Sequence, residues 1–284
     1  MNPARDLARG ASLRRGAWAV RFFLTVILLA ALRSPAASGG GESPSEQQRQ
    51  PSRVSVAAAA NLVFALQALN VEFKRLAPGS ALTVATGASG SLFAQIKNGA
   101  PFDVMLSADT DYPKELVAAG LAEGSSLRVF ASGRLVAWSL HPDLDLSDLA
   151  AAVRNPAVKK IAIAQPKTAP YGRAAQAALE KLGAWREAQA KLVVGESISQ
   201  TMQFAETGNA DIGLVALSVT LAPQLQGKGR WREVPPELYS AVPLDHAAVL
   251  TTRGAANPAA RGYLEFLQSD AAQKIFREFG YGVK

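Results

Sequence analysis

From Val54 to the C-terminus, short apolar runs typical of β-strands alternate with segments whose apolar residues share one helical face. The first run is Val54–Ala60, and the helical spacing of Leu62, Leu66, Leu69 and Phe73 follows it directly. Strands that alternate with helices form a mainly parallel sheet covered by helices on both faces. The chain is therefore predicted to be an α/β protein.

The alternation continues in two series, on either side of a strand expected at 135–140. The other expected strands are 81–85, 103–107, 160–164, 191–194, 211–217 and 247–251. The other expected helices are 92–98, 112–119, 146–153, 174–182, 199–207, 259–268 and 271–279. Glycines that permit a left-handed turn end four of these helices. Two series predict two lobes, although no repeat in the sequence relates them.

Residues 1–38 have the composition of an export signal. Arginines precede the apolar run 22–32, and small residues follow at 36–39. The apolar run is shorter than the ~20 residues that span a bilayer, which favours a cleaved signal over a membrane anchor. The chain has no cysteine, so lipid attachment is excluded. We expect a periplasmic protein with its signal removed; the route, general or twin-arginine, and the cleavage site stay open.

The basic charge of the chain is concentrated in this leader. Of the net charge of +7, six arginines and one acid place +5 in residues 1–38 and leave +2 for the rest. A nearly neutral body lacks the basic surface that nucleic-acid binding requires. Residues 39–53 are rich in Gly, Ser, Pro and Gln and are predicted to form a flexible linker.

Four strand-to-helix turns carry small or hydrogen-bonding residues: 58–61, 86–91, 169–172 and 195–199. In open α/β sheets, ligands bind at the carboxyl ends of strands, where helix N-termini present free backbone N–H groups and a positive dipole end. Asn61, Ser89 and Tyr171 add side-chain donors. Each turn by itself is explained by ordinary helix capping. Together they predict one anion site between the lobes, without identifying the anion.

At these turns the chain resembles the molybdate-binding proteins of ABC transporters, which have the type II periplasmic binding fold. The resemblance runs in one order from Val54 to the C-terminus. It is carried by the segments Ala59–Leu62, Gly87–Leu92, Ala94–Val104, Ser107–Asp109, Gly133–Val136, Ala169–Gly172, Lys181–Trp185 and Ala210–Gly213.

The resemblance implies a two-lobed fold with a ligand cleft and two crossovers between the lobes. Residues 54–140 and 240–284 would form lobe 1, and 141–239 lobe 2. It implies high-affinity binding of molybdate, and of tungstate, by a monomer that delivers the anion to a membrane permease. No cofactor and no direct metal ligand are expected. The oxyanion would be held by Ala60, Asn61, Ser89, Tyr171 and the Ile198 amide.

One feature departs from much of that family. Many members have a ligand-contacting tyrosine at the end of a late strand, where this chain has Ala216, and a small residue in place of Tyr171. Here the phenol is expected from the other turn, and Asn61 replaces the commoner serine, as in a second branch of the family. The order of preference among molybdate, tungstate and sulfate therefore stays open.

Other functions fit the sequence less well. A hydrolase would need catalytic groups, but the two histidines, His141 and His246, are expected at the surface or at a hinge, and the known catalytic motifs are missing. An amino-acid binder would need an arginine, and only Arg173 is near a turn. Asp103 and Asp109 are expected to serve turns and caps, since a carboxylate would repel the anion. A binder of sulfate or another tetrahedral oxyanion is the main alternative.

Overall fold

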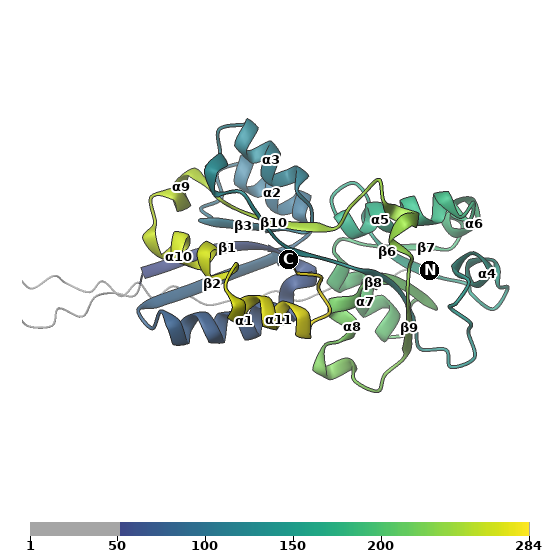
Figure 1. The fold of residues 1–284 in the computed structure, drawn as a ribbon. Coiled ribbons are helices and arrows are strands. Elements are labelled where there is room, and N and C mark those ends of the chain that lie inside the picture. Colours follow the sequence, from purple (N-terminus) through teal and green to yellow (C-terminus); the bar gives the residue numbers. More distant parts are fainter. Residues whose placement is uncertain (1–51, 284) are drawn as a thin grey trace, which may run out of the picture. The chain divides into compact units, whose positions relative to one another are not determined.

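The computed structural model describes residues 52–283, which form two five-stranded sheets covered by helices (Figure 1). The expected signal peptide and nearly all of the expected linker lie outside these residues. The strands are β1 Ser52–Ala59, β2 Ser80–Gly87, β3 Val104–Ser107, β4 Arg128–Ser132, β5 Leu135–Ser139, β6 Ile161–Ala164, β7 Leu192–Gly195, β8 Ile212–Ala216, β9 Arg230–Glu233 and β10 Asp245–Leu250. Within residues 52–283, no helix is long and apolar enough to cross a membrane.

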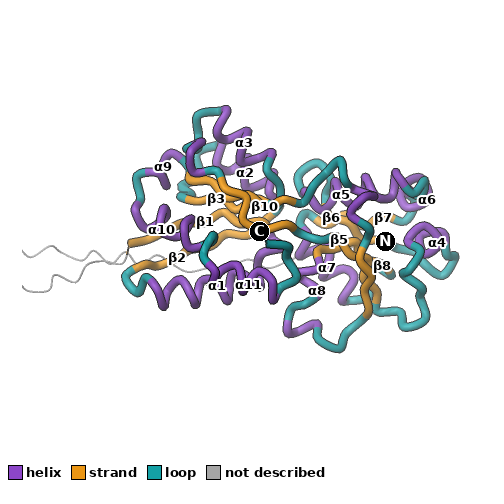
Figure 2. Tube along the Cα trace, viewed as in Figure 1, coloured by secondary structure: helices purple, strands orange, loops and turns teal. Residues whose placement is uncertain are grey.

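The α-helices alternate with these strands over most of the chain, as expected (Figure 2). They are α1 Val63–Leu76, α2 Ser89–Lys97, α3 Asp111–Ala118, α4 Leu149–Arg154, α5 Pro170–Lys181, α6 Trp185–Gln189, α7 Ile198–Glu206, α8 Leu217–Thr220, α9 Thr252–Ala255, α10 Pro258–Phe266 and α11 Asp270–Glu278. Short 3-10 helices lie at Ala60–Leu62, Gly124–Ser126, Pro223–Leu225 and Pro236–Tyr239. The predicted helix ends at Gly99 and Gly120 have φ values of 88° and 69°, which few other residues adopt.

The two sheets share one arrangement of strands. The orders are β2-β1-β3-β10-β4 and β7-β6-β8-β5-β9. In each sheet three strands are parallel, and the fourth, β10 or β5, runs antiparallel to both neighbours. The fourth strand is the one that the chain enters on crossing from the other sheet. The chain enters the fourth strand at the edge of the sheet where the three parallel strands end. The fourth strand therefore runs in the direction opposite to those three.

The first crossing lies earlier than expected. We expected the strand at 135–140 to end lobe 1, but β5 pairs with β8 and β9 in the second sheet, so that boundary is wrong. The crossing falls at Gly133 and Arg134, between β4 and β5. Strand β1 likewise begins at Ser52, inside the expected linker, because Ser52 and Arg53 pair with β2.

Burial follows from the position of each strand. The inner strands β3, β5, β6 and β8 are buried along their whole length, as expected for strands covered by helices on both faces. In the first sheet, α1 and α11 lie on one face and α2 and α3 on the other (Figure 1).

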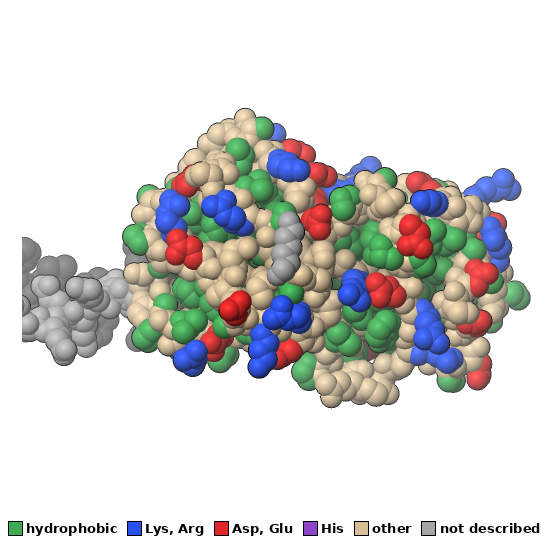
Figure 3. Space-filling view, viewed as in Figure 1, with side chains coloured by type: hydrophobic (Ala, Val, Ile, Leu, Met, Phe, Trp, Pro, Cys, Tyr) green, Lys and Arg blue, Asp and Glu red, His purple; other side chains and the backbone are tan. Residues whose placement is uncertain are grey.

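On the face shown in Figure 3, basic and acidic side chains are interspersed, and no patch of one sign gathers there.

Candidate functional site

A small cavity, partly open to solvent, lies between the two sheets. Five strand-to-helix connections line it, three from the first sheet, after β1, β2 and β3, and two from the second, after β6 and β7. The lining residues are Ala59, Ala60, Asn61, Gly87, Ala88, Ser89, Ala108, Ala169, Pro170, Tyr171 and Ile198. The carboxyl ends of parallel strands from both lobes therefore meet at one place, as open α/β sheets favour.

All five residues expected to hold an anion line this cavity: Ala60, Asn61, Ser89, Tyr171 and Ile198. All five are buried, with exposed fractions of 1% for Asn61 and Ser89 and 2% for Tyr171. The four turns that the sequence singled out are thus brought together from both halves of the molecule.

The cavity wall offers hydrogen-bond donors and no charged side chain. Three of the helical segments that begin there are preceded by alanines, Ala59, Ala88 and Ala169, which make no side-chain cap. The first N–H groups of a helix have no partner within the helix, so those without another acceptor remain available to a ligand. In α2 the Gly90 N–H donates to the Thr168 carbonyl at 2.8 Å and is not among them. Ile198 is the first residue of α7, and its N–H belongs to the same class. Four positive dipole ends therefore converge on the cavity.

Ser89 is oriented so that its hydroxyl is left to donate. The Ser89 Oγ accepts a hydrogen bond of 3.0 Å from the backbone N–H of Ala108. A hydroxyl has one donor hydrogen and two acceptor lone pairs. Because Ala108 uses a lone pair, the hydrogen of Ser89 remains free to donate to an acceptor in the cavity.

The Tyr171 hydroxyl is buried, and within residues 52–283 it is the one buried side-chain polar atom with no hydrogen-bond partner. Burial raises the pKa of this phenol well above its usual value, so the group stays a protonated donor. A buried donor without a partner costs free energy, which a ligand acceptor would recover. Gly133 makes room for it, since a Cβ at that position would lie 2.1 Å from the hydroxyl.

Asn61 uses its side chain differently from our expectation of a direct donor. Its Nδ2 lies 2.7 Å from His246 Nε2 and donates to the Tyr281 hydroxyl at 2.8 Å. Its backbone carbonyl accepts from Tyr281 and from Ser218, both at 3.0 Å. The side-chain nitrogen therefore has two buried protein partners, and the backbone N–H is the donor that Asn61 presents at the turn.

Sequence reasoning missed His246, Tyr281 and Ser218 as parts of the site. His246 was expected at the surface or a hinge; it follows the second crossing but is fully buried. A signal was present, because His246 is a polar residue inside the apolar strand β10. Nothing in the local sequence marked Tyr281 or Ser218, which reach Asn61 from 220 and 157 positions away along the chain.

Polar contacts join the two lobes beside the cavity. Arg173 on α5 forms an ion pair with Asp109, which follows β3, and donates to the Tyr112 hydroxyl at 3.2 Å. Asp109 also accepts from Ser107 Oγ and from the Tyr112 N–H, as expected for a turn residue. On the other side of the cavity, Ser199 Oγ donates to the Ala60 carbonyl at 3.1 Å. These contacts hold the lobes together around the site.

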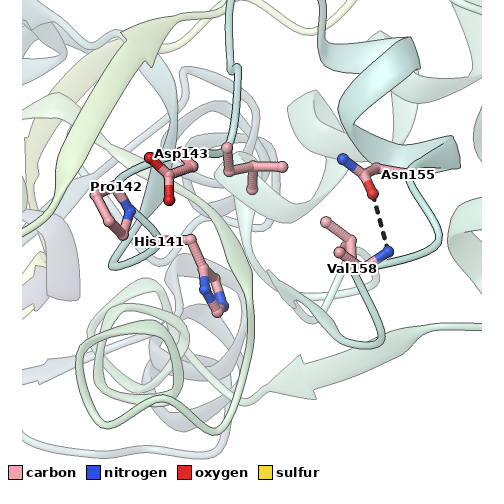
Figure 4. A pocket seen from close by; sticks show the side chains of 7 residues that line it. His141, Pro142, Asp143, Asn155 and Val158 are labelled. Atoms are coloured by element: carbon pink, nitrogen blue, oxygen red, sulfur yellow. Dashed lines mark hydrogen bonds between the residues drawn. The ribbon is translucent and has the colours of Figure 1, made fainter.

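A second hollow lies within the second lobe, at the surface (Figure 4). Its lining residues are His141, Pro142, Asp143, Leu144, Asn155, Ala157 and Val158. His141 is exposed, as expected, and its Nε2 lies 2.9 Å from Asp211. Asp211 also accepts from the N–H groups of Lys159 and Lys160, so the pair serves to join loops. This hollow gathers no converging helix N-termini.

Two α/β lobes joined by two crossings, with a small donor-lined cavity between them, define a two-lobed solute-binding protein. Residues 54–282 match the family described as "Bacterial extracellular solute-binding protein". The chain belongs to this family. Membership confirms the expectation of an extracytoplasmic binding protein rather than an enzyme.

Relatives named as molybdate-binding proteins agree with the family resemblance found at the turns. The chain is 39% identical over 236 residues to "Molybdate-binding protein ModA" of Azotobacter vinelandii, covering 83% of this chain and 92% of the relative. It is 43% identical over 203 residues to the protein of the same name from Rhodobacter capsulatus, covering 72% and 78%.

Solved structures confirm the two-lobed fold. The periplasmic molybdate-binding protein of Azotobacter vinelandii superposes with a TM-score of 0.76 at 31% sequence identity, covering 81% of this chain and 99% of that one. The sulfate-binding protein SubI of Mycobacterium tuberculosis has a TM-score of 0.65 at 16% identity, covering 81% and 86%, and shares the fold alone.

Proposed function

We propose that this protein binds molybdate, and with it tungstate, outside the cytoplasm as a monomer and delivers the anion to the permease of an ABC transporter. The observation that carries the proposal is a cavity of neutral donors contributed by both lobes. At its wall the Tyr171 hydroxyl is buried and has no hydrogen-bond partner in the described part of the chain. Relatives named as molybdate-binding proteins, aligned over most of the chain, support it. The proposed ligand residues are Ala60, Asn61, Ser89, Tyr171 and Ile198.

Neutral donors are sufficient for a doubly charged anion. A hydrogen bond to a charged group contributes about 1.5–3 kcal/mol, and a helix terminus adds about 0.3–1 kcal/mol. About six donors therefore supply a gross 10–20 kcal/mol, from which desolvation and lobe closure subtract. Micromolar affinity requires about 8 kcal/mol, so the donor set is adequate.

The same donors suggest which anions are rejected. Protonated phosphate carries an O–H that requires an acceptor, and an unpaired polar group in a buried site is costly. A fully deprotonated tetrahedral oxyanion meets no such penalty. We therefore expect molybdate and tungstate to bind and phosphate at neutral pH to be excluded.

Calorimetric titration of the purified protein with molybdate, tungstate, sulfate and phosphate tests the proposal. We expect micromolar or tighter binding of molybdate and tungstate. Tight binding of sulfate with weak binding of molybdate would reassign the protein to the sulfate alternative. Failure of all four anions to bind would contradict the oxyanion function.

The sequence of residues 1–51 extends the proposal to export. We infer that residues 1–38 form a cleaved signal that directs the chain to the periplasm, followed by a linker from residue 39 to the start of β1. N-terminal sequencing of the secreted protein in its host tests this. A mature terminus close to residue 39 is the expected result, and an intact Met1 would contradict it.

A further inference from the structure

His246 is the one fully buried histidine among residues 52–283, and it contacts the proposed ligand turn without lining the cavity. Its Nδ1 lies 2.9 Å from the Leu244 carbonyl oxygen. A carbonyl oxygen only accepts hydrogen bonds, so Nδ1 carries a proton. The tautomer of His246 can therefore be read from its surroundings.

The surroundings of the ring favour the neutral form. The rings of Phe130, Tyr171 and Tyr281 lie 5.3–6.1 Å from it, centroid to centroid, and its hydrogen bonds involve no acidic side chain. Burial lowers the pKa of His246 to about 4. A neutral imidazole with its proton on Nδ1 has a bare lone pair on Nε2, so Nε2 accepts from Asn61 Nδ2.

The direction of this bond sets the orientation of the Asn61 amide. One hydrogen of Nδ2 goes to His246 and the other to the Tyr281 hydroxyl. Tyr281 in turn donates to the Asn61 carbonyl, which also accepts from Ser218 of the other lobe. Hydrogen bonds therefore hold both the side chain and the backbone carbonyl of Asn61. The direction of its backbone N–H is then set by the conformation of the turn.

We propose that His246 is a positioning residue of the oxyanion site: in its Nδ1–H tautomer it accepts from Asn61 and fixes the turn that presents the Ala60 and Asn61 backbone N–H groups. This inference rests on the proposed function and deepens it. Asn61 then serves the anion through its backbone, and its side chain anchors the turn. A prearranged donor set raises affinity because its ordering is not required at binding.

Leu244 connects His246 to the crossings between the lobes. Its carbonyl oxygen accepts from the Gly133 N–H at 2.8 Å as well as from His246. Gly133 lies at the first crossing, between β4 and β5, and Leu244 ends the second, between β9 and β10. Through Leu244, His246 links the first-lobe part of the site to both crossings.

Two substitutions at one position separate positioning from packing. In His246→Asn, the asparagine amide lies near the position of Nδ1. It still donates to the Leu244 carbonyl but provides no acceptor for Asn61 Nδ2. Glutamine in His246→Gln reaches the Nε2 position with an oxygen that accepts from Asn61. We expect molybdate affinity to fall about tenfold in His246→Asn, the loss of about one hydrogen bond, and to stay within about threefold of wild type in His246→Gln.

His141→Asn is the matched control, because His141 is exposed and contacts Asp211 away from the cavity; its molybdate affinity is expected to equal that of wild type. Wild-type affinity in a folded His246→Asn variant would overturn the inference. Equal losses in the asparagine and glutamine variants would also overturn it, since they would indicate packing alone. If wild-type protein binds no oxyanion, the proposed function fails instead, so the two failures are distinguishable.

A spectroscopic measurement on the wild-type full chain does not depend on any variant folding. Two-bond ¹H–¹⁵N correlations distinguish the protonated ring nitrogen from the bare one, and the chain has only two histidines to assign. We expect His246 to keep its proton on Nδ1 both without and with molybdate. A proton on Nε2 in the molybdate-bound protein would overturn the inference, because the Asn61 amide would then have turned its nitrogen toward the anion.

Discussion

At the scale of single residues, the site is built from groups that are buried and neutral yet left with a donor to offer. Ser89 Oγ accepts a hydrogen bond from the Ala108 N–H, and the Tyr171 hydroxyl has no partner among residues 52–283. The arrangement of Tyr171 is costly for a protein without a ligand, since buried polar groups are ordinarily paired. The presence of both groups at one cavity indicates a binding site rather than a structural core.

Ser89→Ala tests the first of these donors. The variant loses a charge-assisted hydrogen bond, so molybdate binding should weaken by about 1.5–3 kcal/mol while the fold is retained. Calorimetry measures the affinity, and circular dichroism verifies the fold. An unchanged affinity would remove Ser89 from the ligand set.

Tyr171→Phe removes only a hydroxyl. It should lower the affinity for molybdate without lowering the stability of the ligand-free protein. Molybdate affinity should fall by less than in Ser89→Ala. The ligand-free protein should be as stable as wild type or slightly more so, because the deleted hydroxyl is buried with no partner from Ser52 to Val283. Thermal melting with and without molybdate measures both. Wild-type affinity in this variant would contradict the placement of the ligand phenol at position 171.

At the scale of elements, the start of helix α5 is placed by close packing against β6. A Cβ on Gly172 would lie 2.2 Å from the Ala164 carbonyl oxygen, so only glycine permits this approach. Tyr171 stands beside Gly172 in the same first turn. The packing of α5 therefore determines where the phenol lies in the cavity.

Gly172→Ala should push the first turn of α5 away from β6. We expect the free energy of unfolding to fall by about 1–3 kcal/mol, the usual cost of overpacking, together with weaker molybdate binding as Tyr171 shifts. Gly262→Ala in α10 is the matched control, because its Cβ would meet no atom within 4 Å. Denaturant unfolding compares the two. A Gly172→Ala protein as stable as Gly262→Ala would contradict the packing argument.

The elements also differ in how well the sequence predicted them. Most helices and inner strands were predicted to within a few residues, because their apolar patterns are strong. Strand β9 was missed: all four of its residues, Arg230–Glu233, are exposed, and it is a strand only because it pairs with β5. Strand β4 and helix α6, five residues each, were also missed, since patterns of this length are ambiguous.

At the scale of the whole molecule, the lobes are held together beside the cavity by the Asp109–Arg173 pair. The Asp109 side chain is 4% exposed, and it follows Ala108, which lines the cavity. An unpaired buried carboxylate here would both cost stability and repel an anion. The ion pair therefore neutralises a charge that the site would not tolerate, and joins the lobes.

Arg173→Gln should weaken molybdate binding about tenfold, because it leaves Asp109 buried without its partner. Adding Asp109→Asn should restore part of the affinity by removing the stranded charge. Arg154→Gln, which disrupts an exposed pair with Glu187, is the control and should bind as wild type. If the double variant binds no better than Arg173→Gln, neutralisation is not the role of the pair.

The stability of the whole protein should depend on pH through His246. Burial lowers its pKa to about 4 in the folded protein, from an ordinary value of 6.5. Between these values the unfolded chain binds a proton that the folded protein does not, so stability is full above about pH 6.5 and declines as the pH falls to about 4. The loss amounts to about 3 kcal/mol.

Denaturant unfolding of wild type and His246→Gln at pH 7 and pH 4 isolates this effect, because both proteins share the same carboxylates. Wild type should lose more stability than the variant over this range. Equal losses would show that the ring is not held neutral by burial.

The sequence alone determined the alternation of strands and helices and the presence of four donor-bearing turns, because apolar periodicity and turn composition are local properties of the chain. It also singled out Ala60, Asn61, Ser89, Tyr171 and Ile198, which the fold brings around one cavity. Long-range contacts, by contrast, place β5 in the second sheet and bring His246, Tyr281 and Ser218 to Asn61. Those contacts join residues up to 220 positions apart, and a hydrogen bond between such distant residues exists only once both sheets have formed.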